Sequence, residues 1–350
     1  MKKVLIGMSG GVDSSVAAAV LKKQGYVVTG ATLSLYKEDP VTAQTVDERD
    51  AKAVCQKIGI EHITVDKRET FKNIVIEDFV NSYINGLTPN PCVLCNKAVK
   101  FKEIIEEADK RNIDYVATGH YSALKFDENS GRYLLYRPAD KTKDQTYMLY
   151  KLTQEQLSRT LMPLADYTKE EVREIAREIG LSVADRPDSQ DICFVPDGDY
   201  ADFIKRYTNK SFPVGDYVSA DGKVLGQHKG MIHYTVGQRK GLGIALGKPA
   251  FVVEKQADSN RVVLSDNEEL LMRRTVKITD VNFIPFEKLD GTLNVTAKLR
   301  YRHKDSPATV RMTEENEAVI EFDSHQRAPA PGQSAVLYDG DIVIGGGIIV

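Results

Sequence analysis

The feature that most constrains this chain is a glycine-rich loop between a short apolar run and a helix-like stretch. Lys2–Met8 predicts a buried strand, Val12–Gln24 predicts a helix with an apolar face, and GMSGGVDSS (residues 7–15) joins them. Backbone N–H groups at such a junction bind anions, and serine hydroxyls add further donors. The loop has neither the lysine of a G-x-x-x-x-G-K-[ST] loop nor a G-x-G-x-x-G spacing. It therefore predicts a phosphate site of a different kind on an α/β sheet.

Length and composition set the remaining bounds. A chain of 350 residues suggests two or three domains, and its net charge of −3 does not exclude a nucleic-acid partner, because binding needs only a local basic patch. Four cysteines are too few for a disulfide scaffold and fit a reduced, cytoplasmic setting. The apolar run at the start is interrupted too soon for a signal peptide, and no apolar run approaches the ~20 residues that span a bilayer, so no membrane partner is expected.

The texture of the sequence changes once, near Pro196. Before it, short apolar runs alternate with helical periodicity, as in βαβ units with a parallel sheet. The predicted strands are Lys2–Met8, Val27–Leu35, His62–Val65 and Tyr115–Thr118, and the predicted helices are Val12–Gln24, Val46–Ile58, Phe71–Ile84, Lys97–Arg111 and Lys169–Ile179. A hairpin across the turn ENSG (residues 128–131) interrupts this pattern, and the helix Lys169–Ile179 is opened by a capping box, Thr168 with Glu171, and closed by Gly180. After Pro196 we expect one helix, Tyr200–Arg206, and from about Phe212 only β structure.

Two of the four cysteines form a C-x-x-C pair in NPCVLCNKAVKF, residues 90–101. The spacing of Cys92 and Cys95 alone fits a metal clamp, a redox pair, or a nucleophile with a chance neighbour. Cys193 lies far away in RPDSQDICFVPDGDY (residues 186–200), just before the change in texture. Cys55 lies on the apolar stripe of a predicted helix, and we expect it to serve in packing.

Other motifs lie at places where ligands could bind. GHY (residues 119–121) ends the fourth predicted strand, and KDQTYML (143–149) places a cation, an acid and an amide side by side. GMIHYTVGQRKGLGI (230–244) and KLRYRHK (298–304) lie in the β region. Each has an ordinary structural alternative, namely a buried histidine, turn glycines or a solvated strand face.

The loop SGGVDS (residues 9–14) resembles the pyrophosphate loop of the ATP pyrophosphatases. This superfamily adenylates its substrates and releases pyrophosphate. The resemblance implies that the loop binds ATP and that Asp13 helps to hold Mg²⁺. The residues so assigned are Gly7, Met8, Ser9, Gly10, Gly11, Val12, Asp13 and Ser14. The loop implies activation by ATP and leaves the substrate open.

A longer series of motifs resembles the tRNA-specific 2-thiouridylases. It runs from SGGVDSS through NPC-x-x-CNK-x-x-KF, GHY, KDQ-x-Y, DSQDICF, HYT-x-GQRKGLGI and LRYR to GGGII. This family replaces O2 of the wobble uridine with sulfur in tRNAs for Lys, Glu and Gln. The resemblance implies an adenine-nucleotide α-hydrolase-like parallel sheet with helices on both faces (residues 1–198), a small mostly-β central domain (199–273) that binds tRNA, and a C-terminal β-barrel (274–350).

The same resemblance implies roles for single residues. Cys95 would be the nucleophile, and Cys193 would be the partner that receives sulfur as a persulfide. Leu33, where the family usually has Met, and Gly119 would lie near the adenosine. Contacts with tRNA are implied for Asn90, Pro91, Cys92, His120, Lys143, Asp144, Gln145, Arg300, Tyr301 and Gln333. The sulfur donor would be a cysteine desulfurase, a sulfur-relay protein or free sulfide.

Cys92 departs from the family pattern, because the best-known members carry Asp at this position. In one interpretation Cys92 is a small buried substitute, and Cys95 and Cys193 work by persulfide transfer and disulfide formation. In the other, which we favour, Cys92, Cys95 and Cys193 are ligands of a 4Fe–4S cluster whose open iron delivers hydrosulfide. A Cys₃His zinc site with His120 is weaker, because a closed site would remove the nucleophile. A simple redox pair fits least, because no thioredoxin-like context surrounds it.

The implied chemistry has a physical order. A carbonyl oxygen leaves poorly, so ATP first converts it to an adenylate, and sulfur then attacks C2 and displaces AMP. The attacking sulfur must be anionic, so low-pKa cysteines are expected, and the base must leave the anticodon stack. We expect the two cysteine segments to meet only when tRNA binds. The alternatives are another adenylating tRNA sulfurtransferase with a different target nucleotide, or a non-catalytic tRNA- and nucleotide-binding iron–sulfur sensor.

Overall fold

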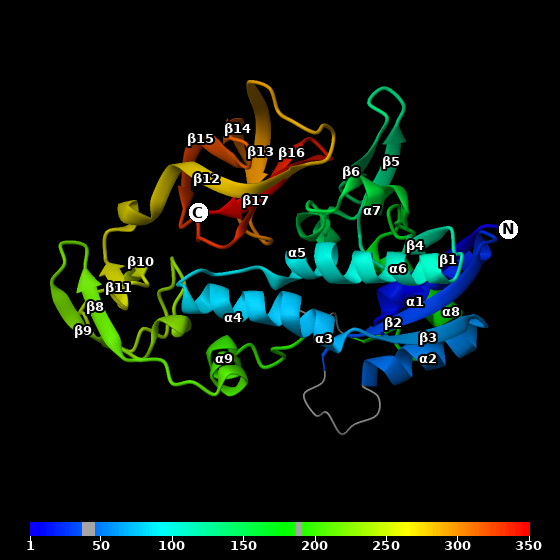
Figure 1. Ribbon diagram of the computed structural model, residues 1–350, viewed down its shortest axis with the longest axis horizontal. Coiled ribbons are helices and arrows are strands. Elements are labelled where there is room, and N and C mark those ends of the chain that lie inside the picture. Colours follow the sequence, from blue (N-terminus) through cyan, green and yellow to red (C-terminus); the bar gives the residue numbers. More distant parts are fainter. Residues whose placement is uncertain (37–45, 187–190) are drawn as a thin grey trace.

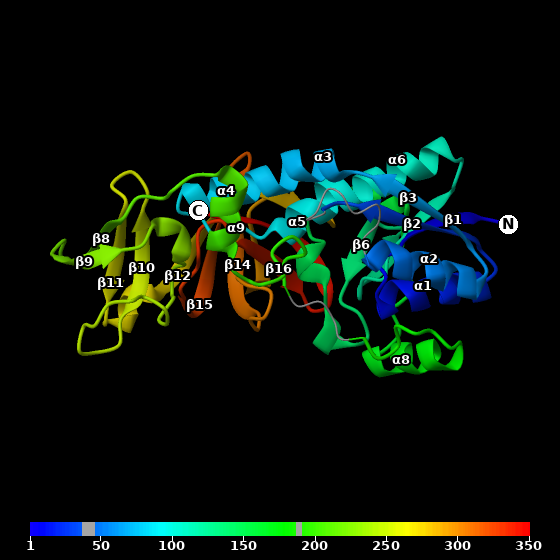
Figure 2. The same cartoon turned by 90° about the horizontal axis from the view of Figure 1, so that it is seen from below.

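A computed structural model describes residues 1–36, 46–186 and 191–350 of the chain. Part of the predicted segment of Cys193, residues 187–190, lies outside the described residues. The molecule has three modules: an N-terminal α/β module, a small central module and a C-terminal barrel (Figure 1). Seen from below, the barrel lies between the other two modules (Figure 2).

The N-terminal module is built on a parallel sheet. Its strands are β1 (Lys3–Gly7), β2 (Val27–Ser34), β3 (Glu61–Asp66), β4 (Tyr115–Ala117) and β7 (Thr160–Leu161), in the order β3-β2-β1-β4-β7. Val4 and Ile6 pack against one layer of helices, and Leu5 between them packs against the other. This alternation is what a strand buried on both faces requires. β7 was not predicted, because two residues show no periodicity.

Helices cover both faces of this sheet, as predicted. α1 (Val12–Lys23), α2 (Val46–Ile58) and α8 (Lys169–Glu178) lie on one face, and α6 (Lys102–Lys110) lies on the other. Cys55 of α2 is buried in the first of these layers, which confirms its role in packing. Because β1 lies between β2 and β4, the sheet has its switch point where the glycine-rich loop and the end of β4 meet.

Two long helices lie side by side and lead away from the sheet (Figure 1). The first comprises α3 (Arg68–Phe71), the π-helical segment η1 (Lys72–Ile76) and α4 (Glu77–Ile84), and the second comprises α5 (Pro91–Cys95), the π-helical segment η2 (Asn96–Phe101) and α6. The second helix begins at Pro91 and not at Lys97 as predicted. Asn90 caps it by accepting from Cys92 N at 3.2 Å, and Pro91 occupies the first helical position.

The central module is a four-stranded sheet preceded by one helix. α9 (Tyr200–Thr208) leads into β8 (Gly215–Ser219), β9 (Val224–His228), β10 (Phe251–Gln256) and β11 (Arg261–Ser265), in the order β10-β11-β8-β9. Phe203 of α9 packs against Phe79 of α4 and Phe194, with ring centroids 6.3 and 5.2 Å away. These aromatic contacts fix the central module against the first long helix.

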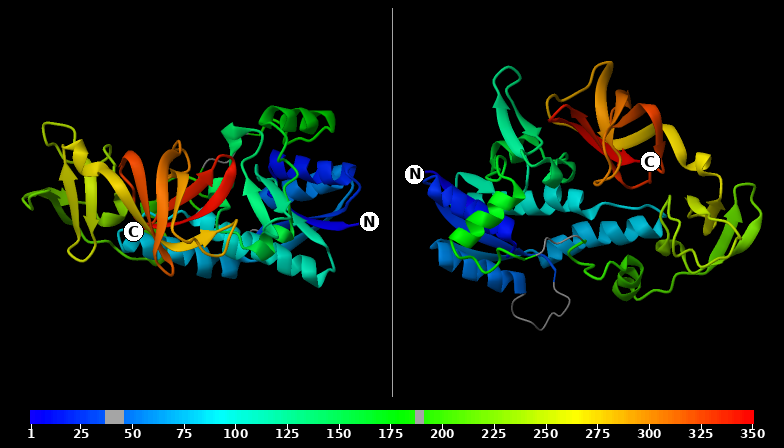
Figure 3. Two further views of the ribbon diagram at one scale, coloured as in Figure 1. Left: turned by 90° about the horizontal axis from the view of Figure 1, so that it is seen from above. Right: turned by 180° about the vertical axis from the view of Figure 1, so that it is seen from behind.

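The C-terminal module is a closed six-stranded barrel, which confirms the predicted fold class. Its strands are β12 (Met272–Phe283), β13 (Thr292–Lys298), β14 (Ser306–Glu314), β15 (Glu317–Arg327), β16 (Ser334–Asp339) and β17 (Ile342–Ile349), and pairing of β12 with β17 closes it. The hairpin of β5 (Ala123–Asp127) and β6 (Arg132–Tyr136) joins this sheet where Tyr136 pairs with Ile342 (Figure 3). The predicted hairpin therefore links the first module to the barrel.

The barrel also shares a hydrophobic core with the second long helix. Val93 and Phe101 of this helix are buried together with Tyr147 and with Val336 and Tyr338 of β16. The cysteine-bearing helix is thus packed against the barrel. The remaining short helices are α7 (Gln154–Ser158) and the 3-10 turns η3 (Lys141–Lys143), η4 (Thr146–Met148), η5 (Met231–His233) and η6 (Glu268–Leu271). Among the described residues, no helix is long and apolar enough to cross a membrane.

Candidate active site

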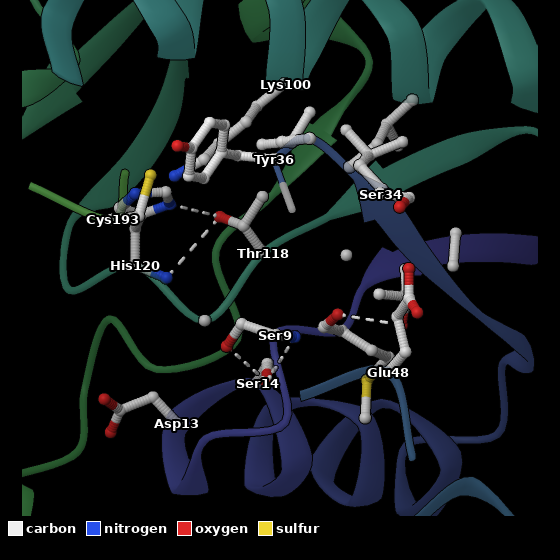
Figure 4. Close-up of a pocket in the computed structure, with 18 of the residues that line it drawn as sticks. Ser9, Asp13, Ser14, Ser34, Tyr36, Glu48, Lys100, Thr118, His120 and Cys193 are labelled. Atoms are coloured by element: carbon white, nitrogen blue, oxygen red, sulfur yellow. Dashed lines mark hydrogen bonds between the residues drawn. The ribbon is translucent and has the colours of Figure 1, made fainter. Parts of the chain in front are cut away.

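A cavity of about 400 Å³ lies where the carboxyl ends of β1, β2 and β4 meet (Figure 4). The loop after β1, the ends of β2 and β4, the helical segment η2 and the segment of Cys193 all contribute to its wall. The lining includes Gly7, Met8, Ser9, Asp13, Ser14, Leu33, Lys100, Thr118, Gly119, His120, Gln145 and Cys193. The structure therefore brings the predicted phosphate loop, the predicted adenosine-site residues and one predicted catalytic cysteine into one cavity.

The glycine-rich loop leaves the N-terminus of α1 open to an anion. Gly11 caps the helix without a side-chain hydrogen bond, and Gly10 adopts φ 73°. Ser14 Oγ accepts from Ser9 N and donates to Gly11 O, each at 3.2 Å, so the loop is folded back onto the helix. The N–H groups of the first turn remain available for phosphate oxygens. Gly10, Gly11 and Val12 shape this turn but do not line the cavity.

Gly119 is needed because two backbones approach closely. A Cβ at this position would lie 2.6 Å from Ser14 N and 2.8 Å from the carbonyl carbon of Asp13. No other side chain fits between the end of β4 and the glycine-rich loop. The glycine of the GHY motif thus allows the loop to rest directly on the sheet, with Leu33 of β2 on the cavity wall nearby.

Asp13 forms an ion pair that the sequence did not reveal. Its carboxylate accepts from Lys169 Nζ at 2.7 and 2.9 Å and from Tyr121 OH at 2.8 Å. Lys169 is the first residue of α8, where the capping box of Thr168 fixes the start of the helix. The capping box predicted the place of Lys169 but carried no signal for its contact. A carboxylate beside a phosphate-binding helix end is a suitable Mg²⁺ ligand, so this residue fits the ion.

His120 is held as a neutral imidazole between the loop and the cysteines. Its Nδ1 lies 2.9 Å from Thr118 Oγ1, and its ring stacks on Phe101 with centroids 6.1 Å apart. Burial, with a smaller effect from the nearby ammonium of Lys100, lowers its pKa to about 3. It is therefore uncharged throughout the neutral range and can serve only as a hydrogen-bonding or stacking group there.

The three cysteines of the predicted site lie near one another. Cys92 and Cys95 belong to α5, and Cys193 lines the cavity beside His120 (Figure 4). Cys95 and Phe194, the neighbour of Cys193, are buried in one apolar core, so the two cysteine segments already meet without tRNA. This differs from the expectation that they would meet only in the complex. Contacts of both segments with one apolar core, which includes Cys95 and Phe194, keep them together.

The thiols are not activated in this state, contrary to the expectation of low pKa values. Burial raises the pKa of Cys95 to about 12 and also raises the pKa values of Cys92 and Cys193. Lys100 acts in the opposite direction on all three, because its ammonium favours the thiolate. Desolvation is the larger effect, so the thiols are protonated until an anionic form is stabilised in another way.

Lys100 is a functional candidate that sequence reasoning missed. It lines the cavity between Tyr36 and His120 and lies close enough to all three thiols for its charge to act on them (Figure 4). In a regular α-helix, residues five apart lie roughly 140° apart around the axis. The π-helical turn of η2 spans Asn96–Phe101 and brings Lys100 back above Cys95. The available signal was a lysine five residues after a cysteine, which the α-helical period hides.

Three thiols are a suitable set of donors for an iron–sulfur cluster, but the geometry of the three cysteines is not that of a preformed metal site. Among the described residues, no group of three His, Cys, Asp or Glu side chains is close enough together to hold one metal ion. The cluster interpretation therefore rests on the donor set, three thiols that converge on one cation, and not on a preformed coordination shape. The zinc alternative with His120 gains no support from the geometry of the described residues.

The predicted tRNA contacts fall into two groups. Gln145 and His120 line the cavity, and Lys143, at the start of the KDQTYML segment, is partly exposed. The start of α5 is formed by Asn90, Pro91 and Cys92. The other group makes contacts within the protein. Asp144 is 6% exposed and faces Arg137 and Lys298 at 3.7 and 3.9 Å.

Arg300, Tyr301 and Gln333 belong to this second group. Arg300 donates to Ala328 O at 2.8 Å, and the ring of Tyr301 lies 6.0 Å from that of Tyr147. Gln333 Nε2 donates to Thr88 O at 2.7 Å. These three side chains hold the barrel and its neighbours together in the protein without tRNA.

The fold and the cavity define a class. A parallel sheet with a helix N-terminus open to phosphate at its switch point, and with an acidic side chain beside it, is the arrangement of ATP-binding pyrophosphate-loop proteins. Three family models match successive parts of the chain: tRNA methyl transferase HUP domain over residues 2–197, tRNA methyl transferase PRC-barrel domain over 201–266, and aminomethyltransferase β-barrel domain over 273–349.

Full-length relatives identify the family within this class. The chain is 51% identical to the tRNA-specific 2-thiouridylase MnmA of Clostridioides difficile, with 99% of this chain and 98% of that protein covered. It is 48% identical to the proteins of the same name from Acetivibrio thermocellus and Clostridium acetobutylicum, with 99% of each chain covered. This chain belongs to the tRNA-specific 2-thiouridylase family, as the series of motifs predicted.

Proposed function

We propose that this chain uses ATP to convert the wobble uridine of tRNA to 2-thiouridine. The observation that carries this function is the shared cavity: the phosphate loop, His120, Gln145 and Cys193 line one space, in a chain that belongs to the tRNA-specific 2-thiouridylase family. A site that holds an activated phosphate and a sulfur nucleophile together can activate an oxygen and then replace it. Both halves of the reaction require this proximity.

Activation takes place at the N-terminus of α1. The N–H groups of the loop Gly10–Ser14 hold the β- and γ-phosphates, and uridine O2 attacks the α-phosphorus, so that the bond to pyrophosphate breaks and an O2-adenylate forms. Asp13 would hold Mg²⁺, which neutralises phosphate charge when bound. In the protein without ligands Asp13 accepts from Lys169 Nζ, so binding of the ion by Asp13 would compete with this contact.

Sulfur transfer takes place at the cysteine side of the cavity. The terminal sulfur of a Cys193 persulfide attacks C2, and the C2–O2 bond breaks as AMP leaves. The Cys95 thiolate then attacks Cys193 Sγ, which forms a disulfide and leaves the electron pair on the sulfur of the product. An external thiol must reduce this disulfide before the next cycle. The proximity of Cys95 and Cys193 to one cation supports these roles.

Cys92 determines which sulfur chemistry operates. As a 4Fe–4S ligand set, Cys92, Cys95 and Cys193 would leave one iron open for hydrosulfide, which such a cluster supplies as the attacking sulfur. The matched variant is Cys92→Asp, because aspartate is the residue that the best-known family members carry. Under the cluster hypothesis this variant loses iron and sulfide-dependent activity, whereas under the persulfide hypothesis it keeps its activity.

The deciding experiment uses protein purified without oxygen, one portion reconstituted with iron and sulfide and one stripped of metal. Each portion receives unmodified glutamate tRNA, ATP-Mg²⁺ and sulfide, and mass spectrometry counts 2-thiouridine. Thiolation by the reconstituted form alone supports the cluster, and equal thiolation by both forms contradicts it. If neither form reacts, a persulfide donor is added, and continued failure with that donor contradicts the function itself. Mapping of the modified nucleoside tests the wobble position against another target nucleotide.

The acceptor tRNAs and the sulfur donor are proposed from the family resemblance. We propose tRNAs for Lys, Glu and Gln as acceptors, and a cysteine desulfurase, a sulfur-relay protein or free sulfide as the donor, in a cytoplasmic setting. We also propose the division into residues 1–198 for ATP and catalysis, 199–273 for tRNA binding and 274–350 as the barrel. Pyrophosphate release that depends on tRNA would separate this enzyme from a non-catalytic iron–sulfur sensor.

A further inference from the structure

The segment that leads into the cysteine-bearing helix is held from two sides. Gln333 Nε2, on the barrel, donates to Thr88 O at 2.7 Å and to Pro89 O at 3.3 Å, and Thr88 N donates to Pro331 O at 2.8 Å. From the central module, Lys255 Nζ donates to Leu87 O at 3.3 Å. Every carbonyl from 87 to 89 is thus bound by a side chain of another module.

The barrel turn is shaped to receive this segment. Gly332 adopts φ 92°, and a Cβ there would lie 2.8 Å from Thr88 N and 3.0 Å from Leu87 Cβ. Any other residue at 332 would therefore displace the segment or strain the turn. Close backbone contact and three directed hydrogen bonds in one place indicate a built joint and not a casual surface contact.

This joint lies one residue before the helix that carries the thiols. Asn90 follows Pro89 and caps α5 by accepting from Cys92 N at 3.2 Å. Val93, on the next turn, is buried with Val336 of β16, which is the strand that begins directly after Gln333. A shift of residues 88–89 would therefore move the helix start, and with it Cys92 and Cys95.

We propose that Gln333 is a positioning residue, which fixes the start of α5 and thereby places the cysteine thiols against the ATP cavity. The inference rests on the proposed function and differs from the direct tRNA contact that the family resemblance implies for Gln333. The carboxamide nitrogen of Gln333 donates to two carbonyl oxygens of the segment, so its donor capacity is used within the protein. Only Oε1 is left for any other partner.

The test compares Gln333→Met, which keeps length but removes both donors, with Gln326→Met on the same barrel. The Gln326 amide donates to Ser324 O at 3.0 Å and accepts from Ser306 Oγ at 3.3 Å, so its contacts stay within the barrel. Hydrogen–deuterium exchange is measured over residues 86–96 in the protein without tRNA. Single-turnover thiolation at saturating tRNA and the Kd for tRNA are measured alongside, and thermal unfolding verifies that both variants are folded.

We expect Gln333→Met alone to increase exchange in residues 86–96 and to slow single-turnover thiolation about tenfold or more, with little change in Kd. Unchanged exchange overturns the inference, and so does a rate that recovers fully at saturating tRNA, because that pattern marks a tRNA contact only. Gly332→Ala, which crowds the same segment from the same barrel turn, should reproduce the increased exchange. If the unmodified protein makes no 2-thiouridine, the proposed function fails, while exchange still decides whether Gln333 holds the segment.

Discussion

Lysine side chains set the electrostatics of this molecule at the residue scale. Lys169 neutralises Asp13 beside the phosphate loop, and Lys100 faces the three thiols from the same cavity. Lys255 supports the segment before the cysteine-bearing helix. Sequence patterns predicted none of these pairings, because each joins residues that are distant in the chain or, for Lys100, brought together by an irregular helical turn.

The first prediction concerns Lys100. Replacing it by Met removes the only cation shown to act on all three thiols among the described residues, so single-turnover thiolation should fall about 100-fold. The matched control is Lys102→Met on the same helix, because the Lys102 side chain is 58% exposed and pairs with Glu106 at 3.9 Å. Formation of 2-thiouridine is counted by mass spectrometry. A rate for Lys100→Met within twofold of the control would exclude a role in the reaction.

The second prediction concerns Lys255, whose pKa burial lowers from its ordinary value of 10.5 to about 8. Between these two values the folded chain has released a proton that the unfolded chain still binds, so the free energy of unfolding rises with pH. Lys255→Met lacks this effect. Denaturant unfolding at pH 7.5, 8.5 and 9.5 should show the wild type gaining stability relative to this variant.

Lys240 is an exposed lysine of the same module, and Lys240→Met is the control for the Lys255 experiment. Its stability should run parallel to that of the wild type over the same pH range. A constant difference between the wild type and Lys255→Met at all three pH values would show that Lys255 is not desolvated in solution.

Helix ends and helix irregularities are the decisive features at the element scale. Periodicity predicted β1, β2, β3 and β4 of the parallel sheet, and cap residues predicted the start of α8 at Thr168 and its end at Gly180, because those signals are local. It placed the start of the second long helix at Lys97, six residues late. Asn90 and Pro91 carry the N-terminal helix signal at the true start, and apolar periodicity alone does not contain this signal.

The π-helical turns η1 and η2 could not be predicted from the sequence. Their extra residue arises where two helices must both pack against each other and present side chains to a cavity, which is a tertiary requirement. The same reason explains why the phosphate loop was predicted residue by residue while Lys100 was missed. Local signals place the loop, and only the assembled helix pair places Lys100.

The third prediction tests the helix start. Asn90→Ala removes the side-chain acceptor for Cys92 N and should lower the free energy of unfolding by about 1 kcal/mol. Asn90→Ser keeps a capping oxygen and should lose much less. Both values come from denaturant unfolding of the full chain. Equal losses in the two variants would mean that the contact of Asn90 Nδ2 with Met148 Sδ, and not the cap, holds this residue.

At the scale of the whole molecule, the barrel packs against the N-terminal module and stabilises the helix that carries Cys92 and Cys95. Val93, Phe101, Val336 and Tyr338 share one core, and Tyr136 pairs with Ile342 of the barrel. The change in texture near Pro196 predicted the order of α/β and β modules, and the fold class is confirmed. The packing of the barrel against the cysteine-bearing helix could not be predicted. Apolar residues on a strand show that one face is buried, but they do not show which element covers that face.

The fourth prediction follows from this shared core. The N-terminal module and the barrel should unfold in a single transition, with calorimetric and van't Hoff enthalpies in agreement for that transition. The central module has a core of its own around Tyr217, Tyr234 and Val262 and could melt separately without altering this expectation. Hydrogen exchange near the midpoint identifies which residues open together. Loss of protection in β13–β16 well before β1 and β4 would contradict it.

The order of synthesis gives the closure of the barrel a further meaning. The ribosome makes the phosphate loop and the thiol-bearing helix long before it reaches Gln333 and β17. Until β16 is made, the helix with Cys92 and Cys95 lacks the strand against which Val93 and Phe101 pack, and the core shared by the N-terminal module and the barrel is incomplete. A polypeptide released early would therefore lack the support that places the thiols against the cavity. Because the barrel is completed last, only a chain that has been translated to its final strands can be competent for thiolation.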